Sequence, residues 1–311
     1  MIGQGSSSFG RRPGPQSRSR SFGPLATGDF ACYPAHPVLR VGRIDYINCD
    51  PLFEGLALGA DAACFPAVPS ELNRRMRAGE LDISPISSIE YARGQQLYWL
   101  VPGVGISASG PIQSVLLLSP VPLRQLDGRT VYLSSESATT VVLLKILMAR
   151  RFGVAPRYQS WDLTDGLPAG PVMVIGDPAL LAGATPSHPH VYDLCQEWVE
   201  LTGLPMTFAL VCLRRDAGLQ WSESLQRLSR GFQENARRWP EGVDAVAARS
   251  SARVGLPLAV MRAYLLGLEF VLTERHAEGL ARYFQLAVEL GELEHAPCLS
   301  GAAGAGLTRE A

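Results

Sequence analysis

The sequence has almost no lysine. Its 28 basic residues include one lysine, Lys145, and the others are all arginine. We expect Lys145 to lie inside a helix, which excludes catalysis through a lysine Schiff base. The chain also has no large net charge: the formal value is −1, and the segment before Asp29 contributes arginines and no acid. Because no basic patch with interleaved aromatic residues is visible, we predict that no nucleic acid is a partner.

Cysteine is scattered rather than clustered. No two cysteines form a CxxC pair and none lies with histidine at a metal-ligand spacing, so we expect reduced thiols and no metal site. This usage favours a cytoplasmic location. No stretch is long and apolar enough for a membrane-spanning helix, and the N-terminal segment lacks the apolar run of a secretory signal, so we expect no membrane partner. The cysteines are Cys32, Cys49, Cys64, Cys195, Cys212 and Cys298.

The composition is that of a folded protein with a substantial core. Hydrophobic residues make up 47% of the 311 residues and charged residues 18%, so a disordered or disulfide-stapled chain is excluded. The length favours about two lobes. Residues 1–37 are rich in Gly, Ser, Pro and Arg, and we expect them to form a disordered extension. The small, polar residues 299–311 predict a frayed tail.

From residue 38 onward, strands and helices alternate. Apolar runs at 38–44, 63–68 and 81–86 predict strands, and the segments 69–78 and 87–93 between and after them predict helices. Strands that alternate with helices at this spacing indicate parallel βαβ units.

A second α/β pattern follows an interruption. Segments 129–133 and 172–175 predict strands, and 141–151 predicts an apolar helix. Two extended segments, 111–119 and 206–213, join this part to the rest of the chain. Two crossings of this kind leave a cleft with a two-strand hinge, which is the geometry of a ligand clamp.

The pattern therefore predicts an α/β, two-lobe, periplasmic-binding-protein-like (type II) fold. The first lobe is expected to span 38–113 plus 212–298, and the second lobe 114–211. Beyond the second crossing we expect helices to about residue 291, including one over 267–290.

Several segments resemble one enzyme family in the same order along the chain. The first reads Val-Gly-Arg-Ile-Asp-Tyr-Ile-Asn at 41–48, and another reads Ser-Gly-Pro-Ile-Gln-Ser-Val at 109–115. Together these segments resemble the chorismate dehydratase family of the futalosine-dependent menaquinone pathway, over about residues 38 to 290. The remaining segments are 51–53, 79–91, 126–131, 137–140, 175–177, 197–198, 202–205 and Phe208.

The resemblance implies a binding-protein-like fold, no organic cofactor and no metal. It also implies the dehydration of chorismate, a small-molecule substrate, to 3-[(1-carboxyvinyl)oxy]benzoate. Two catalytic positions are implied, and they fall on Asn48 and Ser114. We expect the substrate to be bound by residues in the neighbouring motifs, which are Ser87, Ser88, Ser137, Thr139, Thr140, Gly176, Asp177 and Phe208.

The chemistry of chorismate is compatible with these residues. Its carboxylates suit helix N-termini, and residues 48–53, 87–88 and 137–140 each begin a predicted helix with hydroxyl or amide donors. No strong general base lies in the motifs, since Glu90 and Asp177 are only the nearest carboxylates. Our hypothesis is that the enolpyruvyl carboxylate of the substrate is the base, oriented by Asn48. Loop asparagines more often bond local backbone, which is the simpler interpretation of Asn48.

Two other functions fit the same fold. One is a solute-binding component of a transporter, which is disfavoured by the lack of a secretory signal and of a lipidation cysteine. The other is the sister enzyme, 1,4-dihydroxy-6-naphthoate synthase, whose expected first loop and histidine base are not found here. All five histidines lie outside the motifs, at His36, His188, His190, His276 and His295.

Overall fold

A computed structural model describes Met1, residues 38–219 and 222–299, and Ala302. The chain divides into two units, Met1–His36 and Pro37–Ala311, and everything below concerns the second. Almost all of the expected disordered extension and of the expected frayed tail lies outside the described residues.

The larger of two sheets holds six strands of the described chain, in the order β11-β4-β10-β3-β1-β2. Strand β1 pairs in parallel with β2 and with β3, which confirms the predicted βαβ units, and β10 is antiparallel to both β3 and β4. The bounds are β1 Leu39–Ile44, β2 Ala62–Ala67, β3 Ile83–Ser87, β4 Tyr98–Ala108, β10 Met206–Arg214 and β11 Glu269–Val271.

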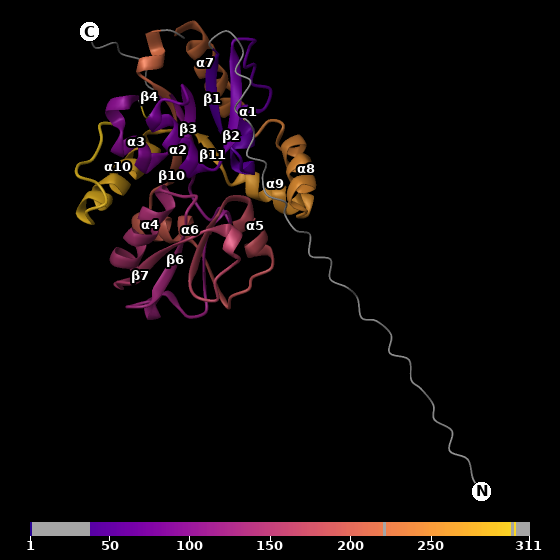
Figure 1. The fold of residues 1–311 in the computed structure, drawn as a ribbon, viewed down its shortest axis with the longest axis vertical. Coiled ribbons are helices and arrows are strands. Elements are labelled where there is room, and N and C mark those ends of the chain that lie inside the picture. Colours follow the sequence, from indigo (N-terminus) through magenta and orange to yellow (C-terminus); the bar gives the residue numbers. More distant parts are fainter. Residues whose placement is uncertain (2–37, 220–221, 300–301, 303–311) are drawn as a thin grey trace. The chain divides into compact units, whose positions relative to one another are not determined.

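The smaller sheet holds five described strands in the order β7-β6-β8-β5-β9. Strand β6 is parallel to β7 and β8, whereas β5 is antiparallel to β8 and β9. In Figure 1 this sheet and helices α4, α5 and α6 occupy the lower half of the folded unit, below the larger sheet. The bounds are β5 Val115–Ser119, β6 Thr130–Ser134, β7 Arg157–Trp161, β8 Val172–Ile175 and β9 His190–Asp193.

Helix α2 shows how local sequence sets an element. It begins at Pro69, whose missing N–H needs no partner in a first turn, and buries Leu72 and Met76 on one face. It ends at Gly79, whose φ of 74° is the left-handed conformation that glycine adopts freely. The predicted helix 69–78 and its stop are confirmed. The helices are α1 Asp50–Phe53, α2 Pro69–Ala78, α3 Ser88–Arg93, α4 Thr139–Leu147, α5 Gly176–Ala184, α6 Leu194–Thr202, α7 Ser222–Arg238, α8 Val243–Val254, α9 Leu258–Leu266 and α10 Glu274–Glu289.

The chain passes between the sheets at two neighbouring strand ends. It leaves the larger sheet after Ala108, at the end of β4, and returns to it at Met206, at the start of β10. These two residues are paired in the sheet, so the two connections lie side by side. All of β10 belongs to the larger sheet. The division into lobes at 113/114 and 211/212 stays a prediction.

The predicted helix over 267–290 is wrong in its first part. Residues Glu269–Val271 form the short edge strand β11, which pairs with β4 and buries Phe270. Helix α10 begins only at Glu274, because Thr273 is its N-cap and forms a capping box with His276. The apolar residues keep their helical spacing across this boundary, so the sequence pattern did not reveal the N-cap at Thr273.

One large apolar cluster joins the two halves of the unit. It includes Val41 and Ile83 of the larger sheet together with Leu143 of α4 and Trp198 of α6, all with no exposed surface. Burying each such side chain contributes about 1.5–3 kcal/mol. A smaller cluster, which includes Leu118, lies in the smaller sheet. Packing of this kind fixes the strand ends that carry polar side chains.

The described cysteines form no disulfide. Cys49, Cys195 and Cys212 are buried thiols, as expected, and Cys32 lies outside the described residues. Within the part of the chain that the structure describes, every helix is too short or too polar to cross a membrane.

Candidate functional site

A cavity opens where the carboxyl ends of β1, β3 and β8 come together with the loop after β6. Its atom-free volume is about 560 Å³, a figure that includes the open solvent at its mouth. Carboxyl ends of strands in open α/β sheets are where ligands bind. The lining residues are Ile44, Tyr46, Asn48, Pro69, Ser87, Ile106, Ile112, Ser114, Val115, Ser137, Thr139, Thr140, Ile175, Gly176, Phe208, Ala209 and Leu268.

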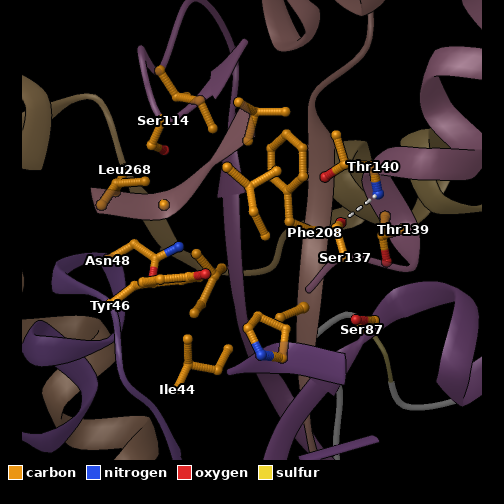
Figure 2. Close-up of a pocket in the computed structure, with 17 residues that line it drawn as sticks. Ile44, Tyr46, Asn48, Ser87, Ser114, Ser137, Thr139, Thr140, Phe208 and Leu268 are labelled. Atoms are coloured by element: carbon orange, nitrogen blue, oxygen red, sulfur yellow. Dashed lines mark hydrogen bonds between the residues drawn. The ribbon is translucent and has the colours of Figure 1, made fainter. Parts of the chain in front are cut away.

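Most of the residues predicted from sequence line this one cavity. Figure 2 shows Asn48 and Ser114 on one side of it and the hydroxyl residues that begin α4 on the other. The predicted residues that the structure brings together here are Asn48, Ser87, Ser114, Ser137, Thr139, Thr140, Gly176 and Phe208.

Asn48 lies in a 3-10 turn, Ile47–Cys49, directly after β1. The amide N–H of Ile47 donates to Asp177 Oδ1 at 3.0 Å, which ties this turn to the start of α5. Asn48 Oδ1 is buried and has no hydrogen-bond partner among the described residues. An unpartnered buried acceptor costs free energy, so Asn48 is placed to bond a bound molecule.

Ser114 lies in the connection between β4 and β5 and is 1% exposed. Its carbonyl accepts a hydrogen bond from the amide N–H of Gly176 at 2.8 Å, but its Oγ has no partner among the described residues. The buried Tyr264 hydroxyl lies near Ser114 without hydrogen-bonding geometry to it. Burial raises the pKa of Tyr264, and the nearby Ser114 hydroxyl lowers it by a smaller amount.

The start of helix α4 supplies further hydroxyl groups. Ser137 Oγ accepts a hydrogen bond from the amide N–H of Thr140 at 3.3 Å, and Thr139 Oγ1 accepts one from the amide N–H of Ile89 at 3.3 Å. These side chains stand at the positive end of a nine-residue helix, an environment that favours an anion.

Ser87 ends β3, and both its amide and its hydroxyl are bonded to the side chain of Asn73. Its amide N–H donates to Asn73 Oδ1 at 3.0 Å, and its Oγ accepts from Asn73 Nδ2 at 3.0 Å. The remaining hydrogen-bonding capacity of this hydroxyl is available at the cavity wall.

Two residues predicted to contact the substrate do not line the cavity. The hydroxyl of Ser88 donates to the carbonyl of Thr207 at 2.7 Å, inside the larger sheet. Asp177 accepts from Ile47 and pairs with Arg253 at 3.1 Å, where burial raises its pKa against the opposing effects of Ile47 and Arg253. Both side chains therefore support the walls from behind.

Tyr46 is a lining residue that the sequence prediction missed. Its ring lies so close to Gly176 that a Cβ there would be 2.7 Å from the ring carbons. Its hydroxyl donates to Glu136, and burial first and Glu136 second raise its pKa, so the hydroxyl stays protonated. An aromatic residue in a polar loop, two positions before Asn48, was the available signal.

The lining contains no carboxylate, no imidazole and no cationic side chain within the described residues. Among these lining residues, Tyr46 alone carries a phenolic hydroxyl. Ile44, Ile106, Phe208 and Leu268 add apolar walls. The cavity can therefore hold a planar ring between apolar side chains and bond anionic groups through neutral donors, without charge of its own.

Comparisons with known proteins identify the family of the chain. A family model described as menaquinone biosynthesis matches residues 39–289. A chorismate dehydratase from Thermus thermophilus is 31% identical over 265 residues, which cover 78% of this chain and 93% of that protein. A chorismate dehydratase from Campylobacter jejuni is 30% identical over 184 residues, covering 57% of this chain and 68% of that protein.

The fold is shared with solved structures. The periplasmic aliphatic sulphonate binding protein SsuA from Escherichia coli superposes with a TM-score of 0.59 at 18% identity, covering 89% of this chain and 95% of that chain. The predicted periplasmic-binding-protein-like α/β fold is thus confirmed.

Proposed function

The chain belongs to the menaquinone biosynthesis family, and we propose that it is a chorismate dehydratase, as its relatives are named. The reaction removes one water from chorismate and leaves 3-[(1-carboxyvinyl)oxy]benzoate. The observation that carries this proposal is the neutral cavity in which Asn48 and Ser114 both present buried polar atoms without partners among the described residues.

The reaction is favourable by itself and needs few chemically reactive groups from the protein. One ring carbon of chorismate loses a proton, the neighbouring carbon loses its hydroxyl, and the electron pair left behind completes an aromatic ring. Because aromatisation drives the reaction, the site has to hold one geometry and stabilise charge. The apolar walls suit the ring, and the hydroxyl and amide donors suit the two carboxylates.

Asn48 and Ser114 act on the reacting half of the substrate. Asn48 orients the enolpyruvyl carboxylate through its Nδ2 group, which donates, whereas its Oδ1 can only accept a hydrogen bond from the substrate. Ser114 donates to the departing hydroxyl or to that same carboxylate. Ser137, Thr139 and Thr140, at the start of α4, bond the remaining anionic group, where each hydrogen bond to a charged acceptor contributes about 1.5–3 kcal/mol.

The base is the substrate's own enolpyruvyl carboxylate. It takes the ring proton, and the proton and the departing hydroxyl leave together as water. The absence of carboxylate and imidazole groups from the described lining supports this route. Glu90, one of the two nearest candidates, is engaged with Arg77 and Tyr98 rather than facing the cavity.

The site must also keep the enolpyruvyl arm away from the ring, since chorismate with its arm folded over the ring rearranges to prephenate. Tyr46 and Gly176 pack against each other at the wall beside Asn48. Holding the arm extended selects the dehydration geometry over the competing one.

Incubation of the purified protein with chorismate tests the function. We expect a new aromatic product with the mass of chorismate less one water, and a Ser114→Ala protein as control should form it far more slowly. Binding of chorismate without turnover would instead indicate a solute-binding protein. Turnover of cyclic de-hypoxanthine futalosine would indicate the sister synthase. We propose that the partner is a small-molecule substrate, and the cytoplasmic location stays a prediction.

A further inference from the structure

We infer that Asp193 is a positioning residue that holds the backbone turn presenting Ser114 to the cavity. The effect on catalysis rests on the proposed dehydration. Asp193 is the last residue of β9 and the N-cap of α6, and it does not line the cavity.

The carboxylate of Asp193 bridges two segments of the chain. Its Oδ1 accepts from the amide N–H groups of Cys195 at 3.0 Å and Gln196 at 3.1 Å, which is an ordinary helix cap. Its Oδ2 accepts from the amide N–H groups of Ile112 at 2.8 Å and Gln113 at 2.6 Å. Only the first pair of bonds is needed to begin α6.

The second pair of bonds holds a strained turn. Gln113 has a φ of 58°, the only positive φ at a non-glycine residue in the described chain. The amide N–H of Ser114 donates to the carbonyl of Ile112 at 2.7 Å, so Gln113 is the centre of a three-residue turn. Such a conformation persists only where the surroundings impose it. The two hydrogen bonds that Asp193 accepts supply that constraint.

The turn fixes the positions of two residues that line the cavity. Ile112 and Ser114 line the cavity, whereas Gln113 between them is exposed. If the turn relaxes, the peptide plane between Gln113 and Ser114 rotates and Ser114 Oγ moves from its place. A displacement of about 1 Å at a reacting group can lower the rate about a hundredfold.

Serine at position 193 separates the two roles of the carboxylate. Serine is a good N-cap, so Asp193→Ser keeps the cap of α6 but loses the bonds to Ile112 and Gln113. We expect kcat for chorismate to fall about 10- to 100-fold with a smaller change in KM. Asp162→Ser makes the same exchange at the N-cap of Leu163–Asp165, which does not line the cavity, and should leave kcat unchanged.

Two further backgrounds show whether Asp193 acts through Ser114. In a Ser114→Ala protein, Asp193→Ser should lower kcat by less than about threefold, because the group it positions is gone. Gln113→Gly, which adopts a positive φ without strain, should restore part of the activity of Asp193→Ser. An equal loss of kcat in the Ser114→Ala background, or no rescue by Gln113→Gly, would overturn the inference.

Hydrogen exchange tests whether Asp193 holds the turn at Ile112 and Gln113, and it does not depend on measuring turnover. In Asp193→Ser the amides of Ile112 and Gln113 should exchange at least tenfold faster than in the wild type, while the amides of α6 keep their protection. Unchanged exchange at Ile112 and Gln113 would overturn the inference. If Asp193→Ser does not fold, Asp193→Asn, which keeps the shape and loses acceptor capacity, carries the same comparison. If wild-type protein fails to dehydrate chorismate, the proposed function fails, and the exchange result still decides the role of Asp193.

Discussion

Two buried polar atoms without partners define the site at the scale of single residues. Asn48 Oδ1 and Ser114 Oγ lie on the same side of the cavity, and neither has a hydrogen bond in the described chain. An unsatisfied buried group of this kind destabilises a folded protein by about 1–3 kcal/mol. Local conflicts of this sort are typical of functional sites, where stability is given up for binding.

Replacing Ser114 by alanine should therefore separate stability from activity. Removal of an unpartnered hydroxyl should leave the free energy of unfolding within about 1 kcal/mol of wild type or slightly higher. The same change should lower kcat/KM about 10²- to 10³-fold. Thermal unfolding and chorismate turnover measure the two effects.

Ser88→Ala is the matched control for that prediction. Its hydroxyl is bonded to the carbonyl of Thr207, so its loss should destabilise the protein by about 1 kcal/mol and leave turnover near wild type. The account of the lining would be contradicted if Ser88→Ala abolished turnover and Ser114→Ala did not.

At the scale of elements, the cavity depends on how strands end and helices begin. Strand β8 ends at Ile175, and helix α5 begins at Gly176 with a φ of 66°. This residue both turns the chain and leaves room for the ring of Tyr46. The neighbouring Asp177 then reaches back to the turn that carries Asn48.

Gly176→Ala should damage the site more than backbone strain alone can explain. Alanine would be strained at this φ and its Cβ would meet the Tyr46 ring, so we expect a loss of stability of about 1–3 kcal/mol and a clear fall in kcat/KM. Gly203→Ala is the control, because Gly203 has a φ of 72° with no atom near its Cβ position. It should lose stability only. Equal effects of the two substitutions on kcat/KM would show that the packing of Tyr46 on Gly176 has no role.

Helix α2 gives a prediction of pH dependence. Hydrogen bonding to Arg74, then to Arg75, lowers the pKa of Glu71 to about 2. A carboxyl whose pKa is depressed in the folded state stabilises the protein above its unfolded pKa, and that stability is lost as pH falls toward 2. Glu71→Gln should thus lower the melting temperature slightly at pH 7, with a difference that shrinks between about pH 4.5 and pH 2. A difference that does not depend on pH would contradict this assignment.

The periodic elements could be predicted from sequence, and the short or irregular ones could not. Helix α2 and strand β8 have clear apolar patterns and were placed at the residues found. Strand β11 has three residues, which is too short for a pattern to be recognised. Asn48 and Ser114 were found because their motifs resemble a family.

Other parts of the site depend on contacts between distant segments. Tyr46 and Glu136 are 90 residues apart, and Ile112 and Asp193 are 81 residues apart. No local pattern joins such pairs, so their roles become visible only once the chain is folded.

At the scale of the folded unit, contacts across the cavity join the two sheets. Tyr46 donates to Glu136, and the amide N–H of Ser70 donates to the carbonyl of the same glutamate at 3.1 Å. Ile47 is bonded to Asp177 in the same way. These contacts hold the walls together around the space in which the substrate is bound.

Tyr46→Phe should weaken binding more than chemistry. The variant keeps the ring but loses the bond to Glu136, so we expect fewer molecules to have the walls held together as in the structure, and substrate binding must restore that arrangement. We expect KM for chorismate to rise about tenfold while kcat changes less. Steady-state kinetics test this expectation, and small-angle scattering should show a larger radius of gyration. An unchanged KM would mean that the Tyr46–Glu136 contact does not hold the walls together.

In the proposed reaction the substrate provides the base, and the protein provides only neutral donors. A substrate base is distinguished from a protein base by the turnover numbers of Glu90→Gln and Asp177→Asn at saturating chorismate, measured together with the dissociation constant of each variant for chorismate. Both variants should keep turnover within about tenfold of wild type. A loss of about 10²- to 10⁴-fold in either variant with unchanged binding is what removal of a general base produces, and it would contradict the account.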